Sequence, residues 1–331
     1  MTLERFGLAV GHASDHAGAT GCTVVRGINE ALRASCAVIG RATGSRELAL
    51  LEPGHLVERV DAILLAGGSA FGLDAAAGVM RWMEARGRGF PTAAGVVPIV
   101  PAAVLFDLGP LGSPRARPTA EMAEAACDAA ASDGIAEGSV GAGTGLTVGK
   151  ILGREHAMKG GFGLAIKEGH GCAAAAMVAV NAFGDVRDGA GRVIAGARAP
   201  DGTFASTERL LASGGPPGGP AKTTAPVFAA SDPDSLPPTP NTTLAVVALD
   251  AAFSRLDLQR IARAATAAYH RRLAPAGSSF DGDIVFSLSP MEGRTAPLAQ
   301  AEMLAVAALE DAIERAVRLA EGRDGIPGLA D

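Results

Sequence analysis

The sequence predicts a layered α/β (α+β) protein, and three observations point to that class. First, 48% of its 331 residues are hydrophobic, which is enough to fill a sizeable core. Second, aromatic residues make up only 4% while the chain holds 44 glycines, so helices can approach sheets closely over small side chains. Third, short apolar runs typical of buried strands alternate with longer helical patterns along the chain.

The first elements are predicted from apolar runs and their punctuation. Residues 61–66 form a run typical of a buried strand, and residues 73–85 predict a helix that a following Arg-Gly pair closes. Residues 97–104 predict a strand, which Pro98 and Pro101 would confine to a sheet edge or a bulge because proline has no N–H to donate.

The next helix and the later strands follow the same logic. Residues 118–132 predict a helix, with a proline near its first turn and Gly134 after its end. Strands punctuated by glycine are expected between residues 138 and 185. The last part of the chain predicts strand, helix, strand and helix, at residues 244–249, 257–272, 284–289 and 297–321.

A proline-rich segment precedes those last four elements. Residues 212–240 hold eight of the chain's 20 prolines and predict a stretch without regular structure. A linker between independent domains is one interpretation. We favour a mobile tail at residues 212–241, because the 90 residues beyond it complete a sheet begun upstream better than they form a small domain of their own. We therefore expect one domain over residues 1–331.

Charge and termini exclude several classes of function. A net charge of −6 without a basic cluster argues against nucleic acid as a partner. Residues 1–6 lack the apolar core of a signal peptide, and charged residues and glycines interrupt the longest apolar stretch, residues 62–83, so no membrane association is expected. No CxxC pair is present, which predicts reduced thiols in a cytoplasmic protein at Cys22, Cys36, Cys127 and Cys172.

The strongest chemical signal is the tripeptide Asn241-Thr242-Thr243, at the junction between the proline-rich segment and the strand predicted after it. If the bond before Thr242 breaks, this one residue carries a nucleophile, its Oγ1, and a base, its freed α-amino group. The simpler interpretation is that the two threonines begin a half-buried strand. The tripeptide thus indicates a chain that cuts itself, but needs support from other residues.

Two aspartates supply part of that support. Asp281 and Asp283 lie 39 and 41 residues after Thr242, where the run 284–288 opens. Carboxylates at i and i+2 of an extended chain point to the same face, and their repulsion is tolerated where they hold an ammonium group or manage protons. A calcium site is an alternative, but two carboxylates fall short of the roughly six to eight oxygen ligands that calcium takes.

Lys159 and Asn181 complete the candidate set. Lys159 stands in a glycine-rich stretch, and Asn181 ends the apolar run 176–180. A surface cation and a strand-end cap are their simpler interpretations. Together with Thr242 and the aspartates they supply a cation near the nucleophile and an amide donor for an oxyanion, and such chemistry needs no cofactor.

Other motifs fit less well. Residues 67–72 resemble a nucleophile elbow around Ser69, but Phe71 stands where the motif needs glycine. Residues 145–150 resemble a phosphate loop that lacks its first glycine and its final Ser/Thr. His12 and His16 have the spacing of helical metal ligands, but their neighbours predict a loop. We expect neither a nucleotide site nor a metal site.

Six segments together resemble the self-processing peptidase family of DmpA-type aminopeptidases, β-aminopeptidases and the nylon-oligomer hydrolase NylC. The likeness runs from about residue 7 to 320. The segments are VGHA at 10–13, TGCTVV at 20–25, LAGGSAFGL at 65–73, VPIVPAA at 97–103, GAGTG at 141–145 and KGG at 159–161. The chain is most similar to the NylC-like branch, which uses Thr after Asn where the DmpA branch uses Ser after Gly.

The resemblance implies a role for each candidate. Thr242 corresponds to the family nucleophile, Asn181 to the amide at the oxyanion site, Lys159 to the lysine near the nucleophile, and Asp281 and Asp283 to the acidic pair. Some members place a tyrosine in the pocket. The only tyrosine here, Tyr269, falls inside a predicted helix, so no tyrosine contribution is assumed.

The resemblance also implies architecture and activity. It implies a four-layer αββα sandwich like that of N-terminal-nucleophile hydrolases, with Thr242 at a central strand. Cleavage between Asn241 and Thr242 would give an α fragment, residues 1–241, and a β fragment, residues 242–331, that stay associated, in a homo-oligomer of αβ units. The expected substrate is a small peptide or amide. An uncleaved binding or scaffold protein and a serine hydrolase using Ser69 are the alternatives.

Overall fold

The computed structural model describes residues 2–109, 111–215, 241–279 and 281–331. Most of the proline-rich segment, residues 216–240, lies outside the described residues, so its predicted lack of regular structure stays a prediction. The described strands form two large sheets and three small ones. The first large sheet, in spatial order, contains β1 (Leu8–Asp15), β2 (Thr20–Gly27), β6 (Ala62–Ala66), β9 (Ala102–Val104) and β4 (Ser45–Arg46).

The second large sheet holds the strands that the candidate residues flank. In spatial order it contains β12 (Gly161–Gly169), β13 (Cys172–Val180), β16 (Leu244–Leu249), β18 (Ile284–Pro290), β3 (Leu32–Val38) and β5 (Arg59–Val60). The small sheets pair β10 (Thr147–Val148) with β11 (Met158–Lys159), β7 (Phe90–Thr92) with β8 (Gly95–Val97), and β14 (Asp185–Arg187) with β15 (Val193–Ala195) and β17 (Leu273–Ala274).

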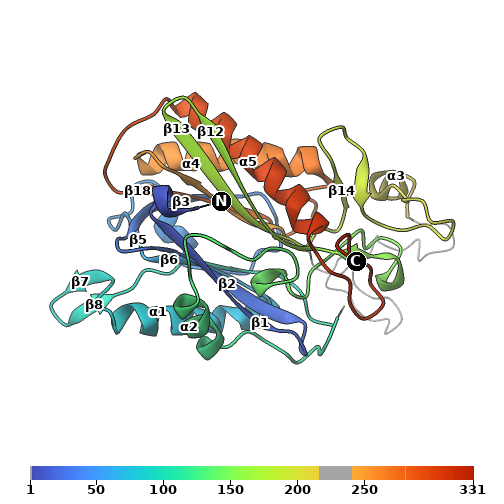
Figure 1. Cartoon of the computed structure of the whole chain (residues 1–331), viewed down its shortest axis with the longest axis horizontal. Helices are drawn as coiled ribbons and strands as arrows, with labels where there is room; N and C mark the ends of the chain where they lie inside the picture. Colours follow the sequence, from blue (N-terminus) through green and yellow to red (C-terminus); the bar gives the residue numbers. More distant parts are fainter. Residues whose placement is uncertain (1, 110, 216–240, 280) are drawn as a thin grey trace.

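Helices cover the outer face of each large sheet (Figure 1). On the first sheet lie α1 (Ala76–Glu84) and α2 (Ala120–Asp128), and on the second lie α4 (Arg255–Arg272) and α5 (Leu298–Arg318). The short α3 (Thr207–Ala212) stands beside the β14 sheet. The 3₁₀ helices are η1 (Glu4–Phe6), η2 (Leu48–Leu51), η3 (Ser69–Ala75), η4 (Gly141–Gly143) and η5 (Arg154–His156). This arrangement confirms the predicted four-layer αββα sandwich.

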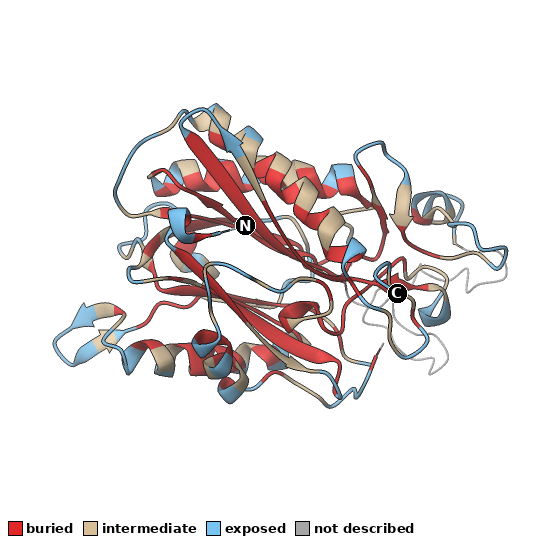
Figure 2. Cartoon of the chain, in the orientation of Figure 1, coloured by how far each residue is buried: buried red, intermediate tan, exposed pale blue. Residues whose placement is uncertain are grey.

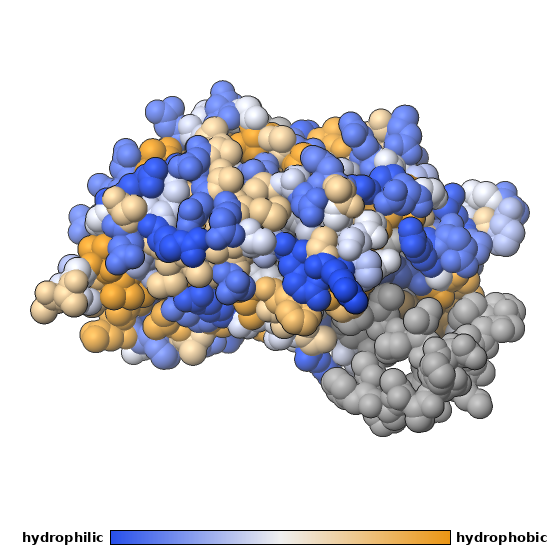
Figure 3. All heavy atoms as spheres, turned by 90° about the horizontal axis from the view of Figure 1, so that it is seen from below, coloured by the Kyte–Doolittle hydropathy of each residue, from blue (hydrophilic) through white to orange (hydrophobic). Residues whose placement is uncertain are grey.

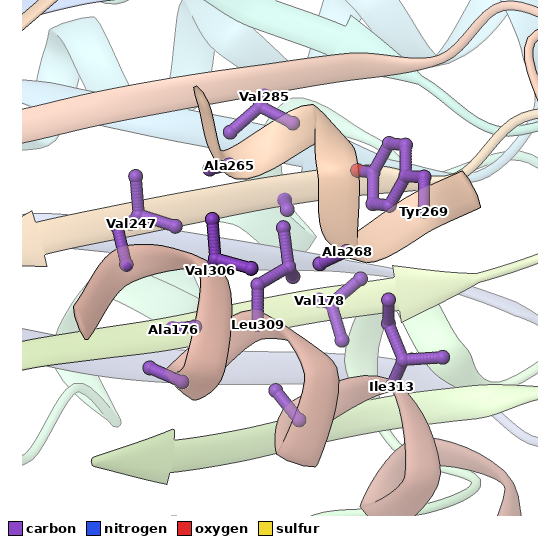
Figure 4. Packing of buried hydrophobic residues seen from close by; sticks show 14 of the residues in the cluster. Ala176, Val178, Val247, Ala265, Ala268, Tyr269, Val285, Val306, Leu309 and Ile313 are labelled. Carbon is purple, nitrogen blue, oxygen red and sulfur yellow. The ribbon is translucent and has the colours of Figure 1, made fainter. Parts of the chain in front are cut away.

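Three hydrophobic layers separate the four structural layers. One lies between the two sheets, where Phe162 and Met177 of the second sheet share a cluster with Ile63 and Leu65 of the first. The other two lie under the helices, and Figure 2 shows the buried residues concentrated on the strands and the inner helix faces. Figure 4 shows α5, through Val306, Leu309 and Ile313, packed over β13 and β16. Alanines of the helices and strands, among them Ala176, Ala265 and Ala268, share this cluster, which agrees with the small side chains of the composition.

Capping residues fix where the helices begin. The Ser254 hydroxyl accepts from the Asp257 N–H at the start of α4, and the Thr119 hydroxyl accepts from the Met122 N–H at the start of α2. The predicted strands at 61–66, 244–249 and 284–289, and the helices at 257–272 and 297–321, are confirmed to within three residues at each end. The predicted helix at 118–132 is shorter, because Asp128 ends α2.

One prediction in the first half was wrong. Residues 97–104 are not one strand at a sheet edge: β8 ends at Val97, β9 begins at Ala102, and β9 lies between β6 and β4. The two prolines fall in the connection between these strands, where no ladder needs their missing N–H. The helix predicted at residues 73–85 is confirmed as α1, which begins three residues later, directly after the 3₁₀ helix η3.

The N-terminal strands β1 and β2 were not predicted from the sequence. β1 continues through Asp15, so His12 lies on a strand and not in the predicted loop, and its Nδ1 lies 2.9 Å from the Thr23 Oγ1 on β2. The four cysteines are free, as predicted, and all four are buried. Within the described residues no helix is long and apolar enough to cross a membrane. The face that carries α1 and α2 mixes hydrophilic and hydrophobic residues (Figure 3).

Candidate active site

Sheet topology brings four of the predicted residues to one edge of the second sheet. Asn181 directly follows β13, Thr242 precedes β16, and Asp281 and Asp283 precede β18. Because β13 runs antiparallel to β16 and β16 runs parallel to β18, the end of β13 meets the starts of the other two strands. All four residues are buried, and Thr242 is 5% exposed.

The peptide bond between Asn241 and Thr242 lies among polar groups. The Thr242 hydroxyl donates to the Asn241 carbonyl oxygen at 2.7 Å, and the Gly282 N–H donates to the same oxygen at 2.8 Å. The Thr242 N–H faces the Asn181 carbonyl oxygen at 3.4 Å. The nucleophile candidate therefore touches the carbonyl group that it would attack, and a backbone donor already polarises that carbonyl.

The two aspartates accept bonds from the backbone around the tripeptide. Asp283 Oδ1 accepts from the Thr243 N–H at 2.7 Å and Oδ2 from the Gly277 N–H at 3.2 Å, while Asp281 Oδ2 accepts from the Ser278 N–H at 2.7 Å. Burial, with the Asp281 charge adding to it, raises the pKa of Asp283 to about 7, and burial also raises the pKa of Asp281. Asp283 can therefore hold a proton near neutral pH.

Lys150 is the lysine that the structure places in this group, and sequence reasoning missed it. Its Nζ donates to the Asn181 Oδ1 at 2.8 Å, to the Asn181 carbonyl at 3.0 Å and to the Asn241 Oδ1 at 2.7 Å. Burial lowers the pKa of Lys150 to about 7, against the opposing pull of the two aspartates. The available signal was its place just after the glycine-rich motif at 141–145, in the segment considered for a phosphate loop.

Lys159 lies elsewhere in the interior. Its Nζ donates to the Thr144 carbonyl at 2.9 Å and the Leu146 carbonyl at 2.8 Å, and burial lowers its pKa to about 7. These bonds hold the chain that leads from the glycine-rich motif into β10. Lys150, and not Lys159, thus donates to Asn181 and Asn241.

Asn181 connects three parts of the site. Its Oδ1 accepts from Lys150 and from the Thr147 N–H, and its Nδ2 donates to the Phe106 carbonyl at 2.9 Å. An amide nitrogen carries two hydrogens, so one remains for a substrate oxygen. The Asn241 carbonyl oxygen accepts from the Gly282 N–H and from the Thr242 hydroxyl.

Tyr269 lies on α4, among the buried residues of the helix layer (Figure 4). Its hydroxyl lies 3.1 Å from the carbonyl oxygens of Thr243 and Ile284, at the starts of β16 and β18, and the ring is fully buried on α4. Since the hydroxyl can donate its single hydrogen to only one oxygen at a time, the contact is shared between the two strands. The tyrosine therefore stabilises the starts of β16 and β18 from the side of α4.

Ser69 lies apart from this cluster. Its backbone adopts a left-handed conformation at φ 52°, and its N–H donates to the Leu105 carbonyl, at the start of η3. A surface pocket of about 780 Å³ lies beside η3, and none of the predicted site residues lines it. The pocket is lined by Ser45, Arg46, Ala70, Phe71, Leu73, Asp74, Arg117, Pro118 and Thr119. Within the described ranges no group of three or more His, Cys, Asp or Glu side chains could hold a metal ion.

Gly282→Ala should block reaction at Thr242. A methyl group at Gly282 would lie 2.6 Å from the Thr242 Oγ1 and 2.7 Å from the Ala42 carbonyl oxygen, closer than atoms in contact allow. We expect the hydroxyl to be displaced and any cleavage at Asn241 to slow by about 100-fold or more, since a small misplacement of reacting atoms costs that much. Gly171→Ala is the matched control, because no atom lies within 4 Å of the added methyl there, although its positive φ strains any side chain. Cleavage of Gly282→Ala at the wild-type rate would contradict this geometry.

The raised pKa of Asp283 predicts a pH dependence of stability. The folded chain holds the Asp283 proton up to about pH 7, while the unfolded chain loses it near the ordinary value of 3.8. The stabilisation is complete below about pH 4 and is lost as the pH rises to about 7, by up to about 1.4 kcal/mol per pH unit. In the uncleaved Thr242→Ala chain, adding Asp283→Asn should remove this slope in the free energy of unfolding measured with urea. An unchanged slope would place the proton on another group.

Sequence comparisons relate this chain to known peptidases and amide hydrolases. The profile of Peptidase family S58 matches residues 6–328. A Mycobacterium tuberculosis protein described as an uncharacterized aminopeptidase is 41% identical over 290 residues, covering 84% of this chain and 78% of that protein. A 6-aminohexanoate-oligomer endohydrolase of Kocuria is 27% identical over 289 residues, covering 86% and 74%.

Solved structures share the architecture at lower identity. The L-aminopeptidase D-Ala-esterase/amidase of Ochrobactrum anthropi, described as a variant of the Ntn hydrolase fold, has a TM-score of 0.68 and 20% identity, covering 98% of this chain and 89% of that one. A Burkholderia β-aminopeptidase has a TM-score of 0.65 and 20% identity, covering 98% and 88%. The chain belongs to peptidase family S58 and is a hydrolase of peptide or amide bonds.

Proposed function

We propose that this hydrolase activates itself by cutting between Asn241 and Thr242 and then uses Thr242 as an N-terminal nucleophile. The observation that carries the proposal is the contact of the Thr242 hydroxyl with the Asn241 carbonyl, whose oxygen also accepts from the Gly282 N–H. That arrangement combines an adjacent nucleophile with a preorganised donor on the carbonyl oxygen.

Cleavage would proceed through an ester. Thr242 Oγ1 attacks the Asn241 carbonyl carbon, the C–N bond breaks, and the Thr242 nitrogen takes up the proton lost by the hydroxyl. Water then hydrolyses the ester, which leaves a carboxylate on Asn241 and returns the hydroxyl to Thr242. The Gly282 N–H stabilises the oxyanion during the first step. Loss of one donor to such an oxyanion typically lowers the rate by about 100- to 1000-fold.

The mature site would work by the same acyl transfer. The freed Thr242 amine takes the Oγ1 proton while Oγ1 attacks a substrate amide, and the leaving amine receives that proton before water hydrolyses the acyl-Thr242 ester. Lys150 and the Thr242 nitrogen share the Asn181 carbonyl as acceptor, so a charge on Lys150 disfavours an ammonium on Thr242 and keeps the base neutral. In this proposal Lys150 has the role that was predicted for Lys159.

The two fragments would stay together after cleavage. β16 and β18 of the C-terminal fragment lie between β13 and β3 of the N-terminal fragment. Arg255 at the start of α4 also donates to the carbonyls of His55 and Val57, and Asp250 after β16 forms an ion pair with Arg5. Removing either fragment would therefore open the centre of a buried sheet. We propose an αβ unit with these fragments, acting in the cytoplasm on small peptides, amino-acyl amides or oligoamides, and assembling as a homo-oligomer.

The test follows cleavage and activity in the same samples. Freshly purified protein is incubated, and at each time the cleaved fraction is measured on a denaturing gel while a panel of amino-acid p-nitroanilides reports amide hydrolysis. We expect activity to rise in proportion to the cleaved fraction. Full activity in an uncleaved sample would contradict an N-terminal nucleophile and turn attention to Ser69, which a fluorophosphonate probe would label. Cleaved protein that hydrolyses no amide would favour the binding or scaffold interpretation.

A further inference from the structure

The side chain of Asn241 occupies a site of its own next to the bond proposed to break. Asn241 is fully buried, and its Oδ1 accepts from the Lys150 Nζ at 2.7 Å. The other two bonds of that ammonium both go to Asn181. An ammonium group has three hydrogens, so Asn241 supplies the last of the three acceptors that Lys150 can use.

Cleavage would leave this arrangement incomplete. Asn241 becomes the C-terminus of the α fragment, and substrate can reach Thr242 only once Asn241 withdraws. Asn181 stays in place, because it is fixed at the end of β13 and bonded to the Phe106 carbonyl. Lys150 then keeps two acceptors and lacks the third, beside the position where an acyl group is attached to Thr242. An enclosed charged donor without its partner costs free energy until a ligand supplies one.

We propose that Lys150 and Asn181 form the acyl-side subsite of the mature enzyme, and that this subsite selects N-terminal asparaginyl amides, whose side-chain oxygen takes the position of the Asn241 Oδ1. The inference rests on the proposed function and names the substrate class of that same site. Thr242 Oγ1 is the attacking atom both in cleavage and in turnover, and the Gly282 N–H is the donor on the carbonyl oxygen in both. The acyl group of a substrate therefore binds to the same two groups as the acyl group of Asn241 does during cleavage.

The geometry distinguishes asparagine from residues of similar shape. Leucine has the same branching as asparagine but offers no acceptor, so it leaves Lys150 unpaired. A site built to bond a polar group of its substrate rejects the analogue that lacks the group far more strongly than an apolar pocket rejects a change of size. Aspartate also offers acceptors, but its carboxylate would add a third negative charge close to Asp281 and Asp283, whose charges already act on Lys150. A neutral amide supplies the acceptor that Lys150 lacks and adds no negative charge.

The test compares asparaginyl, leucyl and aspartyl p-nitroanilides on fully cleaved wild-type protein. We expect kcat/KM for the asparaginyl substrate to exceed that for the leucyl substrate by about 10- to 100-fold, the worth of one hydrogen bond to a charged group. In Lys150→Met the ratio of the two should fall to about one, whatever happens to the absolute rates. A wild-type ratio of one or less, with both substrates hydrolysed, overturns the subsite while the proposed function stands. If cleaved protein hydrolyses no anilide, the proposed function fails and the subsite with it.

Cleavage of the chain itself gives a second, independent readout. Asn241→Leu keeps the shape of the side chain before Thr242 and removes its oxygen, so self-cleavage should slow by about tenfold or more. Glu208→Gln changes a residue of α3 that forms an exposed ion pair with Arg187 of β14, and this control should cleave at the wild-type rate. Wild-type cleavage of Asn241→Leu would contradict a subsite that reads the side-chain oxygen.

Discussion

Thr242→Ala should remain a single 33.1 kDa chain and show no amide hydrolysis above background. The substitution removes the hydroxyl that contacts the Asn241 carbonyl, so the ester cannot form and no free α-amine is made. One change thus removes both nucleophile and base, and loss of a nucleophile typically costs on the order of 10⁶ in rate. Denaturing gels over several days and p-nitroanilide assays measure the two effects.

Two variants make this result specific. Thr242→Ser keeps a hydroxyl at the same position and should still cleave and hydrolyse amides, at reduced rates. Thr243→Val should also cleave, because only the backbone groups of Thr243 bond to Asp283 and Tyr269. Amide hydrolysis by Thr242→Ala at the wild-type rate would place the nucleophile elsewhere.

Lys150→Met should slow both self-cleavage and turnover by about 100-fold, with the fold retained. Methionine has nearly the length of lysine but cannot donate, so the oxygens of Asn181 and Asn241 lose their shared charged partner. The Thr242 amine also loses the neighbouring charge that keeps it neutral. Cleavage rates on gels and kcat on an amide substrate, together with the melting temperature, measure the effect.

Lys159→Met is the matched control for that variant. Both lysines are buried at their ammonium ends and both have pKa values lowered to about 7, but the Lys159 ammonium donates to the carbonyls of Thr144 and Leu146. Its loss leaves those carbonyls without a donor, which costs about 1 to 3 kcal/mol each in stability. We expect a lower melting temperature with cleavage kept within about tenfold. A folded Lys159→Met chain that fails to cleave, beside a Lys150→Met chain that cleaves normally, would reverse the assignment.

The C-terminal part of the fold could be predicted because each element carries its own signal. The run 244–249 is apolar throughout, as suits a strand buried on both faces, and Ser254 caps α4 three residues before Asp257. The N-terminal strands were missed because β1 mixes Gly11, His12 and Ser14 with its apolar residues, so it shows no clean alternation. The order of strands in each sheet depends on contacts far apart in sequence and could not be predicted from periodicity.

Some residues of the candidate site could likewise be predicted from the sequence, and others could not. Asn181, Thr242 and Asp283 stand at the ends of apolar runs, so their place at one sheet edge follows once the strands pair. Lys150 does not stand at the end of an apolar run. Its place in the site depends on two backbone hydrogen bonds, from the Gly149 N–H to the Gly184 carbonyl and from the Lys150 N–H to the Phe183 carbonyl. The glycine-rich surroundings of Lys159 made it look like the better candidate, although its ammonium serves two carbonyls in the interior.

Intact mass spectrometry with N-terminal sequencing of the purified wild-type protein tests the central claim most directly. At 33.1 kDa over 331 residues, cleavage before Thr242 should give pieces of about 24 and 9 kDa, and the smaller should begin Thr-Thr-Leu-Ala. That result would establish the new N-terminus on which the mechanism depends. A chain that stays intact through long incubation, or a cut at another bond, would contradict it.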